Sequence, residues 1–109
     1  MSPEPPDPVH VRRARMYAAE RLWVDAYEWN DGAVSIEGQD LGPNTPGGDG
    51  YEYFLTVAPA EVPLLVAALG GGADDDPLAL LAAHGTGIVQ GGESRWLKEH
   101  GVPFTLYTW

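Results

Sequence analysis

The fold depends on the stretch from residue 22 to residue 41, which reads LWVDAYEWNDGAVSIEGQDL. Two runs rich in aromatic and β-branched residues flank Asn30-Asp31-Gly32. Such runs are typical of strands, and Asp-Gly is a preferred pair for a tight type I′ turn. The stretch therefore predicts a β-hairpin.

The length of the turn decides which side chains of this hairpin are buried, because a shift of one residue moves every side chain to the other face. A two-residue loop at Asp31-Gly32 places Asp25 opposite Gly38. A three-residue loop places Asp25 opposite Glu37, and like charges at opposite positions destabilise a sheet. We therefore expect the two-residue loop. It gives one buried face made of Trp23, Tyr27, Trp29, Val34 and Ile36.

Asp25 lies on this predicted aromatic face. An ionised carboxylate in such a place needs a partner or access to water. It could face a ligand, or it could be a carboxylate at the core margin that pairs with an arginine or a backbone N–H. Pairing is the more common arrangement, and both interpretations stay open.

The rest of the chain predicts one α+β domain at residues 9–109, preceded by a disordered leader at residues 1–8 that contains four prolines. Beside the hairpin we expect strands at residues 9–19, 51–57 and 104–109, helices at 59–69, 76–85 and 93–100, and a loop at 42–50. For residues 9–19 a helix stays open as an alternative. The expected architecture is a small, mostly antiparallel sheet with about three short helices packed on one face.

The charge of the chain is unevenly distributed. The formal net charge is -10, and no Lys or Arg lies between Leu22 and Ser94, a stretch that holds most of the acidic residues. A surface of one sign repels phosphate backbones and anionic lipid and attracts basic proteins. We therefore expect a basic protein partner, with neither nucleic acid nor a membrane as a ligand. Acidity that only keeps the protein soluble is the simpler alternative.

Motifs for specific chemistry are absent from the sequence. The chain has no Cys, which excludes disulfides, thiolate metal sites and a cysteine nucleophile. His10, His84 and His100 lack the spacing of metal ligands on one helix, and the glycine-rich stretch 85–91 does not follow a strand as a dinucleotide-binding loop does. We expect no cofactor and no metal, and a binding protein rather than an enzyme. No apolar stretch is long enough for a membrane span, so a cytoplasmic location is expected.

The stretch Glu37-Gly38-Gln39-Asp40-Leu41-Gly42, together with Tyr51-Glu52-Tyr53-Phe54, resembles a set of small acidic actinobacterial proteins with no assigned activity. The resemblance covers roughly residues 22–109. It implies no function, and no functional residue follows from it.

Three functional hypotheses follow. The first is an immunity-like or antitoxin-like module that binds a basic partner through Trp or Tyr anchors and through Asp25, Asp40, Asp49 and Asp74 to Asp76. The second is a small-molecule-binding protein or enzyme with a pocket between sheet and helices, lined by Trp23, Tyr27, Trp29, Tyr53 and Trp96 and polarised by Asp25. The third is a homodimer formed through the terminal strand, which ends in Tyr107 and Trp109.

Overall fold

A computed structural model describes residues 8–19, 21–40 and 51–108 of the chain. The predicted leader, apart from Pro8, and the predicted loop at residues 42–50 lie outside these described residues. So do two residues of the functional hypotheses, Asp49 and Trp109.

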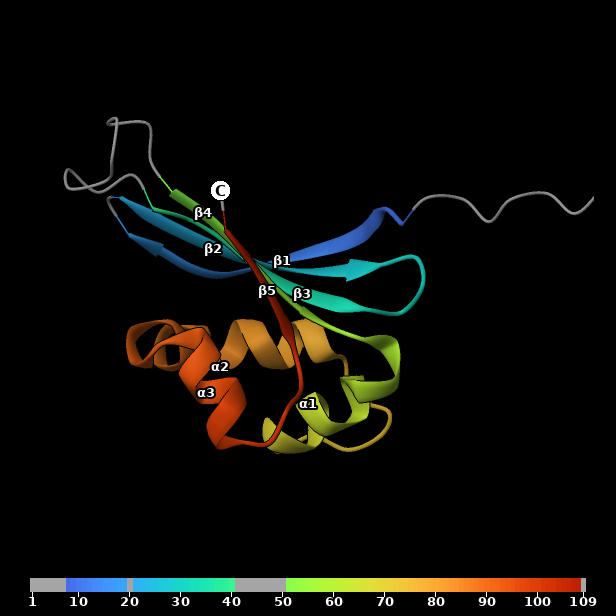
Figure 1. The fold of residues 1–109 in the computed structure, drawn as a ribbon. Helices are drawn as coiled ribbons and strands as arrows, with labels where there is room; N and C mark the ends of the chain where they lie inside the picture. The colour runs from blue at the N-terminus through green and yellow to red at the C-terminus, as the bar shows by residue number, and fades with distance from the viewer. Residues whose placement is uncertain (1–7, 20, 41–50, 109) are drawn as a thin grey trace, which may run out of the picture.

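The described residues form a five-stranded antiparallel sheet with helices packed on one of its faces (Figure 1). The strands are β1 (His10–Ala19), β2 (Leu22–Trp29), β3 (Val34–Asp40), β4 (Tyr51–Val57) and β5 (Thr105–Thr108), and they lie side by side in chain order. Between β4 and β5 the chain forms the short 3₁₀ helix η2 (Pro59–Glu61) and the α-helices α1 (Val62–Ala68), α2 (Pro77–Gly91) and α3 (Glu93–Glu99). The predicted α+β class, the strand at residues 9–19 and the helices on one face are confirmed.

The hairpin of β2 and β3 has a three-residue loop, so the predicted register is wrong by one residue. Gly32 N donates to Trp29 O at 3.0 Å, and Trp29 N donates to Ala33 O at 2.9 Å. Gly32 has a φ of 93°, the left-handed conformation that the last position of such a loop requires. Asp25 therefore pairs with Glu37 and not with Gly38.

This register places the aliphatic side chains of the hairpin under the helices and its aromatic side chains on the opposite face. Val34 and Ile36 are buried as predicted, whereas Trp23, Tyr27 and Trp29 are only half-buried and lie outside the core. The core joins the covered face of the sheet, mainly Val24, Ala26, Val34, Ile36, Leu55 and Val57, to Leu65, Leu69, Leu78, Leu81, Ile88 and Leu97 of the helical segment. Each buried Leu, Ile or Val stabilises the fold by about 1.5–3 kcal/mol. The predicted aromatic core was wrong because the one-residue change of register places Val34 and Ile36 on the face opposite the aromatic side chains of β2.

Helix α2 runs to Gly91 and not to the predicted end near Gly85. A Cβ atom on Gly85 would lie 2.1 Å from Met16 O, so this glycine allows α2 to approach the backbone of β1 closely. Its role is tertiary packing, which a local helix-stop signal does not reveal. The predicted start of the helix is confirmed, because Asp76 Oδ1 accepts a hydrogen bond from Leu78 N at 3.0 Å.

Arg12 of β1 ties the start of α2 to the sheet. Its Nη1 and Nη2 donate to the two carboxylate oxygens of Asp76 at 2.8 and 2.7 Å, and its Nε and Nη2 donate to those of Glu28 at 3.0 and 2.9 Å. Hydrogen bonds from Arg12 lower the pKa of Glu28 and of Asp76 below their ordinary values of 4.5 and 3.8. The guanidinium group therefore stabilises both carboxylates in their ionised form.

Acidification will weaken the fold through this contact. Because the folded pKa values of Glu28 and Asp76 are lowered, their contribution is complete above about pH 5 and is lost as the pH falls through the lowered values. Arg12→Met should therefore reduce the free energy of unfolding near neutral pH by about 1 kcal/mol, since all three side chains are partly exposed. In urea unfolding curves, this difference in the free energy of unfolding between Arg12→Met and the wild type should vanish at roughly pH 2. Arg13→Met, at an exposed position on the other face of the sheet, is the control. If Arg12→Met is still less stable than the wild type in acid, the ionised carboxylates are not the cause of the lost stability.

Candidate functional site

The candidate site is the sheet face that no helix covers within the described part of the chain (Figure 1). The uncovered face of an antiparallel sheet is usually polar. Here the strand registers bring aromatic rings from three strands to it: Trp23, Tyr27 and Trp29 of β2, Phe54 of β4 and Tyr107 of β5. Among them lie His10, Arg13 and Arg15 of β1 and the acidic residues Asp25, Glu37 and Glu52. Trp, Tyr and Arg are the residue types enriched in protein interfaces.

Asp25 and Glu37 form the like-charge pair that the predicted register avoided, and β1 neutralises it. Arg15 Nε lies 2.5 Å from Asp25 Oδ1, and His10 Nε2 lies 2.8 Å from Glu37 Oε2. The two acidic side chains are only 13% and 14% exposed. The positive charge of Arg15 beside Asp25 and the hydrogen bond between His10 and Glu37 oppose the repulsion that would otherwise destabilise this register.

His10 fixes the geometry of the neighbouring rings. Its ring stacks on Tyr27 with the centroids 4.0 Å apart and meets Trp29 edge-on at 4.2 Å. Trp29 Nε1 donates to Ser35 Oγ at 2.9 Å, and Ser35 Oγ in turn donates to Glu37 Oε2 at 2.6 Å. A surface whose rings are held in this way loses little conformational entropy when a partner binds.

The hydrogen bonds of this network do not connect its side chains in the way that a serine nucleophile requires. A serine nucleophile needs a histidine that accepts its proton, and an exposed oxygen that can attack. Ser35 is 1% exposed, and its hydroxyl and His10 both bond to the same oxygen of Glu37. The hydrogen bonds hold the side chains of this face in fixed positions.

A depression of ≈160 Å³ lies on this face over β2, β3 and β4. Its lining consists of three carboxylates, three aromatic rings, an amide and a glycine: Asp25, Glu37, Glu52, Trp23, Tyr27, Phe54, Gln39 and Gly38. Carboxylates attract a cation directly, and aromatic ring faces attract it through their quadrupole. The depression therefore suits a positively charged group.

The structure divides the predicted site residues between two faces of the sheet. Trp23, Asp25, Tyr27 and Trp29 share the open face. Tyr53 lies on the covered face, 8% exposed, where its hydroxyl donates to Glu93 at 2.7 Å. The other two are Trp96 of α3, whose ring stacks on His100, and Asp40, which is half-buried in the last position of β3. The predicted pocket between sheet and helices is therefore not formed by these residues.

The acidic residues before α2 have mainly local roles. Asp76 caps the helix and binds Arg12, and Asp75 accepts a hydrogen bond from Gly72 N at 2.7 Å. Asp74 is exposed. The helix-capping role that the sequence suggests for this cluster is thus observed for Asp76.

Sequence reasoning missed several residues of the open face, namely His10, Arg15, Glu37, Glu52 and Phe54. A signal was present in residues 10–15, where one His and three Arg make a predicted strand basic. Antiparallel pairing of β1 with β2 places this basic strand beside acidic side chains, Arg12 opposite Glu28 and Arg15 opposite Asp25. The negative charge expected for the middle of the chain is therefore partly neutralised by β1.

Within residues 8–19, 21–40 and 51–108, no helix has the length and apolar character that a membrane crossing requires. The same residues contain no group of three or more metal-ligating side chains suited to hold an ion. Comparisons of the chain with protein-family models, with curated proteins and with solved structures gave no match.

Proposed function

We propose that this chain is a cytoplasmic protein-binding module that takes a cationic side chain of a basic partner on the open face of its sheet. The observation that carries the proposal is the depression in which Asp25, Glu37 and Glu52 lie beside the rings of Trp23, Tyr27 and Phe54. An immunity-like role, in which the module covers a basic surface of an effector protein, agrees with this chemistry.

The size of the depression favours a side chain over a free ligand. Sites for small molecules usually enclose about 300–1,000 Å³. The depression of ≈160 Å³ is smaller and matches the end of one Lys or Arg side chain. The surrounding face supplies the rest of the contact area, because Trp29, Arg13 and Tyr107 extend it beyond the depression on both sides.

The charges of the face favour recognition of a cation at its centre. Arg15 and His10 compensate Asp25 and Glu37 from the β1 side, whereas Glu52 lies exposed on β4. A partner cation would therefore enter between Glu52 and the two inner carboxylates. Complementary charges at such a place raise the association rate and determine which partner binds.

Glu52→Gln should weaken binding of basic peptides about tenfold at low salt, because it removes an exposed carboxylate from the depression. The probes are Lys-rich and Arg-rich peptides with neutral peptides of equal length, and the readout is the change in Trp fluorescence on titration, to which Trp23 and Trp29 of the open face contribute. Asp74→Asn is the matched control, since it changes the net charge by the same amount at a distant exposed loop. Equal weakening in both variants would mean that only net charge matters, and no preference for basic peptides would contradict the proposal.

A further inference from the structure

The two edges of the sheet differ in how they are protected against pairing with another strand. The outer edge of β1 carries Arg12, Arg13 and Arg15, and its register is interrupted between His10 and Arg12 and again between Arg15 and Tyr17. Charges and bulges of this kind prevent edge-to-edge pairing. Strand β5 has the uncharged sequence Thr-Leu-Tyr-Thr and a continuous register with β4, and all four of its residues are exposed.

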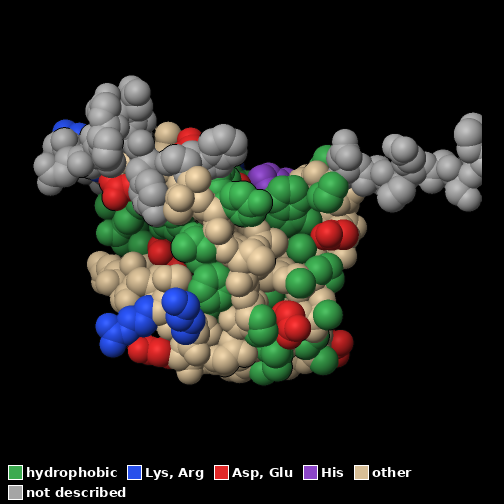
Figure 2. Space-filling view, in the orientation of Figure 1, with side chains coloured by type: hydrophobic (Ala, Val, Ile, Leu, Met, Phe, Trp, Pro, Cys, Tyr) green, Lys and Arg blue, Asp and Glu red, His purple; other side chains and the backbone are tan. Residues whose placement is uncertain are grey.

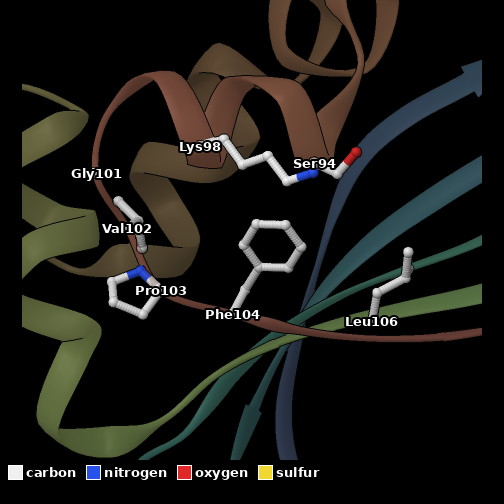
Figure 3. Close-up of a pocket in the computed structure, with 7 residues that line it drawn as sticks. All are labelled: Ser94, Lys98, Gly101, Val102, Pro103, Phe104 and Leu106. Atoms are coloured by element: carbon white, nitrogen blue, oxygen red, sulfur yellow. The ribbon is translucent and has the colours of Figure 1, made fainter.

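A shallow, mostly apolar groove lies between α3 and the segment that leads into β5. It has a volume of ≈610 Å³ and is lined by Ser94 and Lys98 of α3 and by Gly101, Val102, Pro103, Phe104 and Leu106. Figure 3 shows the side chains of Phe104 and Leu106 on the side of β5 that faces α3, with Lys98 extending along α3 above them. Leu106 is 54% exposed and Tyr107 is 71% exposed, on opposite faces of the strand. Exposed apolar side chains on an unprotected edge are typical of an interaction site.

We infer that the occupant of this edge is β5 of a second copy of the chain, paired antiparallel about a two-fold axis normal to the sheet. Such an axis places residues of equal number on the same face of the combined sheet. When the axis passes beside Leu106, the two Leu106 side chains meet on the helix side. Each of them then lies next to the groove that Phe104 lines in its own copy. The two Tyr107 side chains lie on the open side, so the aromatic faces of both copies form one surface.

Charge permits a second copy at this edge more readily than elsewhere on the molecule. Two molecules that each carry a net charge of -10 repel one another, so they associate only through a patch that lacks negative charge. Among the described residues that line the groove, the only charged side chain is the positive Lys98. In Figure 2, which has the orientation of Figure 1, hydrophobic side chains and uncharged atoms cover much of the centre, basic and acidic side chains lie together at the lower left over α3, and further acidic side chains lie toward the right.

The expected association is weak, because a pairing of four residues per strand is short. Stable interfaces bury about 1,200–2,000 Å² in total, and smaller contacts give dissociation constants in the micromolar to millimolar range. The dimer should therefore form at high protein concentration. The inference does not depend on the proposed basic partner, because the dimer forms through the β5 edge and uses none of the carboxylates of the open face.

Sedimentation velocity of the full chain over roughly 10 μM to 1 mM tests this inference. The wild type should shift from monomer to dimer, whereas Leu106→Lys should stay monomeric because it places a charge on the edge and next to its own symmetry mate. Leu64→Lys, at a 47% exposed position on α1, should dimerise like the wild type. Circular dichroism of Leu106→Lys shows whether the variant is folded, and Thr105→Lys provides a second edge substitution on the other face. A wild type that is monomeric throughout, or dimers of a folded Leu106→Lys chain, would overturn the inference.

Discussion

Gly85→Ala will destabilise the protein by about 3 kcal/mol, although the same substitution at an exposed helix position usually stabilises a helix by up to about 1 kcal/mol. The new Cβ atom would lie 2.1 Å from Met16 O and 2.7 Å from the Met16 carbonyl carbon. These are backbone atoms of β1, so no rotation of a side chain relieves the overlap. Helix α2 must move away from the sheet, and the contacts of Leu81 and Ile88 with the core loosen.

The control for this substitution lies in the same helix. Gly87 has no atom within 4 Å of the position that a Cβ would take. Gly87→Ala should therefore raise the free energy of unfolding by about 0.5–1 kcal/mol. Urea unfolding followed by circular dichroism measures both changes. Similar stabilisation by the two substitutions would show that α2 does not approach β1 as closely as the structure has it.

Arg15→Met will cost about 2 kcal/mol near neutral pH, because it leaves Asp25 without its cation directly opposite Glu37. The value lies between the small effect of an exposed ion pair and the 3–5 kcal/mol lost when a buried pair is broken. This intermediate estimate follows from exposure, since the Arg15 side chain is 50% exposed and that of Asp25 only 13%. The prediction tests the hairpin register directly.

A double-mutant cycle isolates the pair. In the Asp25→Asn background, Arg15→Met should cost much less, because the carboxylate that needs the cation is absent. Arg13→Met, on the same strand and the same face, should change the free energy of unfolding by less than about 0.5 kcal/mol. If Arg15→Met costs the same with and without the Asp25 carboxylate, the ion pair does not stabilise this register.

Local patterns were sufficient to predict most of the secondary structure. Alternation in residues 51–57, the Asp76-Pro77 start of α2 and the presence of a hairpin around Asp31-Gly32 depend on neighbours in the chain, and the structure confirms them. The two-residue length of the hairpin loop was not confirmed. The end of α2 could not be predicted in this way. Gly85 has the local signal of a helix stop, but its role depends on Met16 in another element.

The sequence predicted that several residues of the candidate site share one face of β2. It did not predict that this face is the one without helices. Alternation alone places Trp23, Asp25, Tyr27 and Trp29 on one face. Which side chains of β3 join them depends on the loop length, and the three-residue loop is tolerated because Arg15 pairs with Asp25 and His10 hydrogen-bonds to Glu37. These partners come from a strand whose pairing the sequence does not specify, so the argument from like-charge repulsion selected the wrong register.

The strand order has a consequence for how the chain folds. Strands β1, β2 and β3 are neighbours in sequence as well as in space, so their pairings close short loops. Residues 58–104, which form the helical layer, separate β4 from β5, and closing so long a segment costs more entropy. The last strand is thus held by one short, non-local pairing. If β5 detaches, it uncovers the edge of β4, where β5 of another copy can bind, so the segment that we propose to join two molecules is also the one best placed for domain swapping.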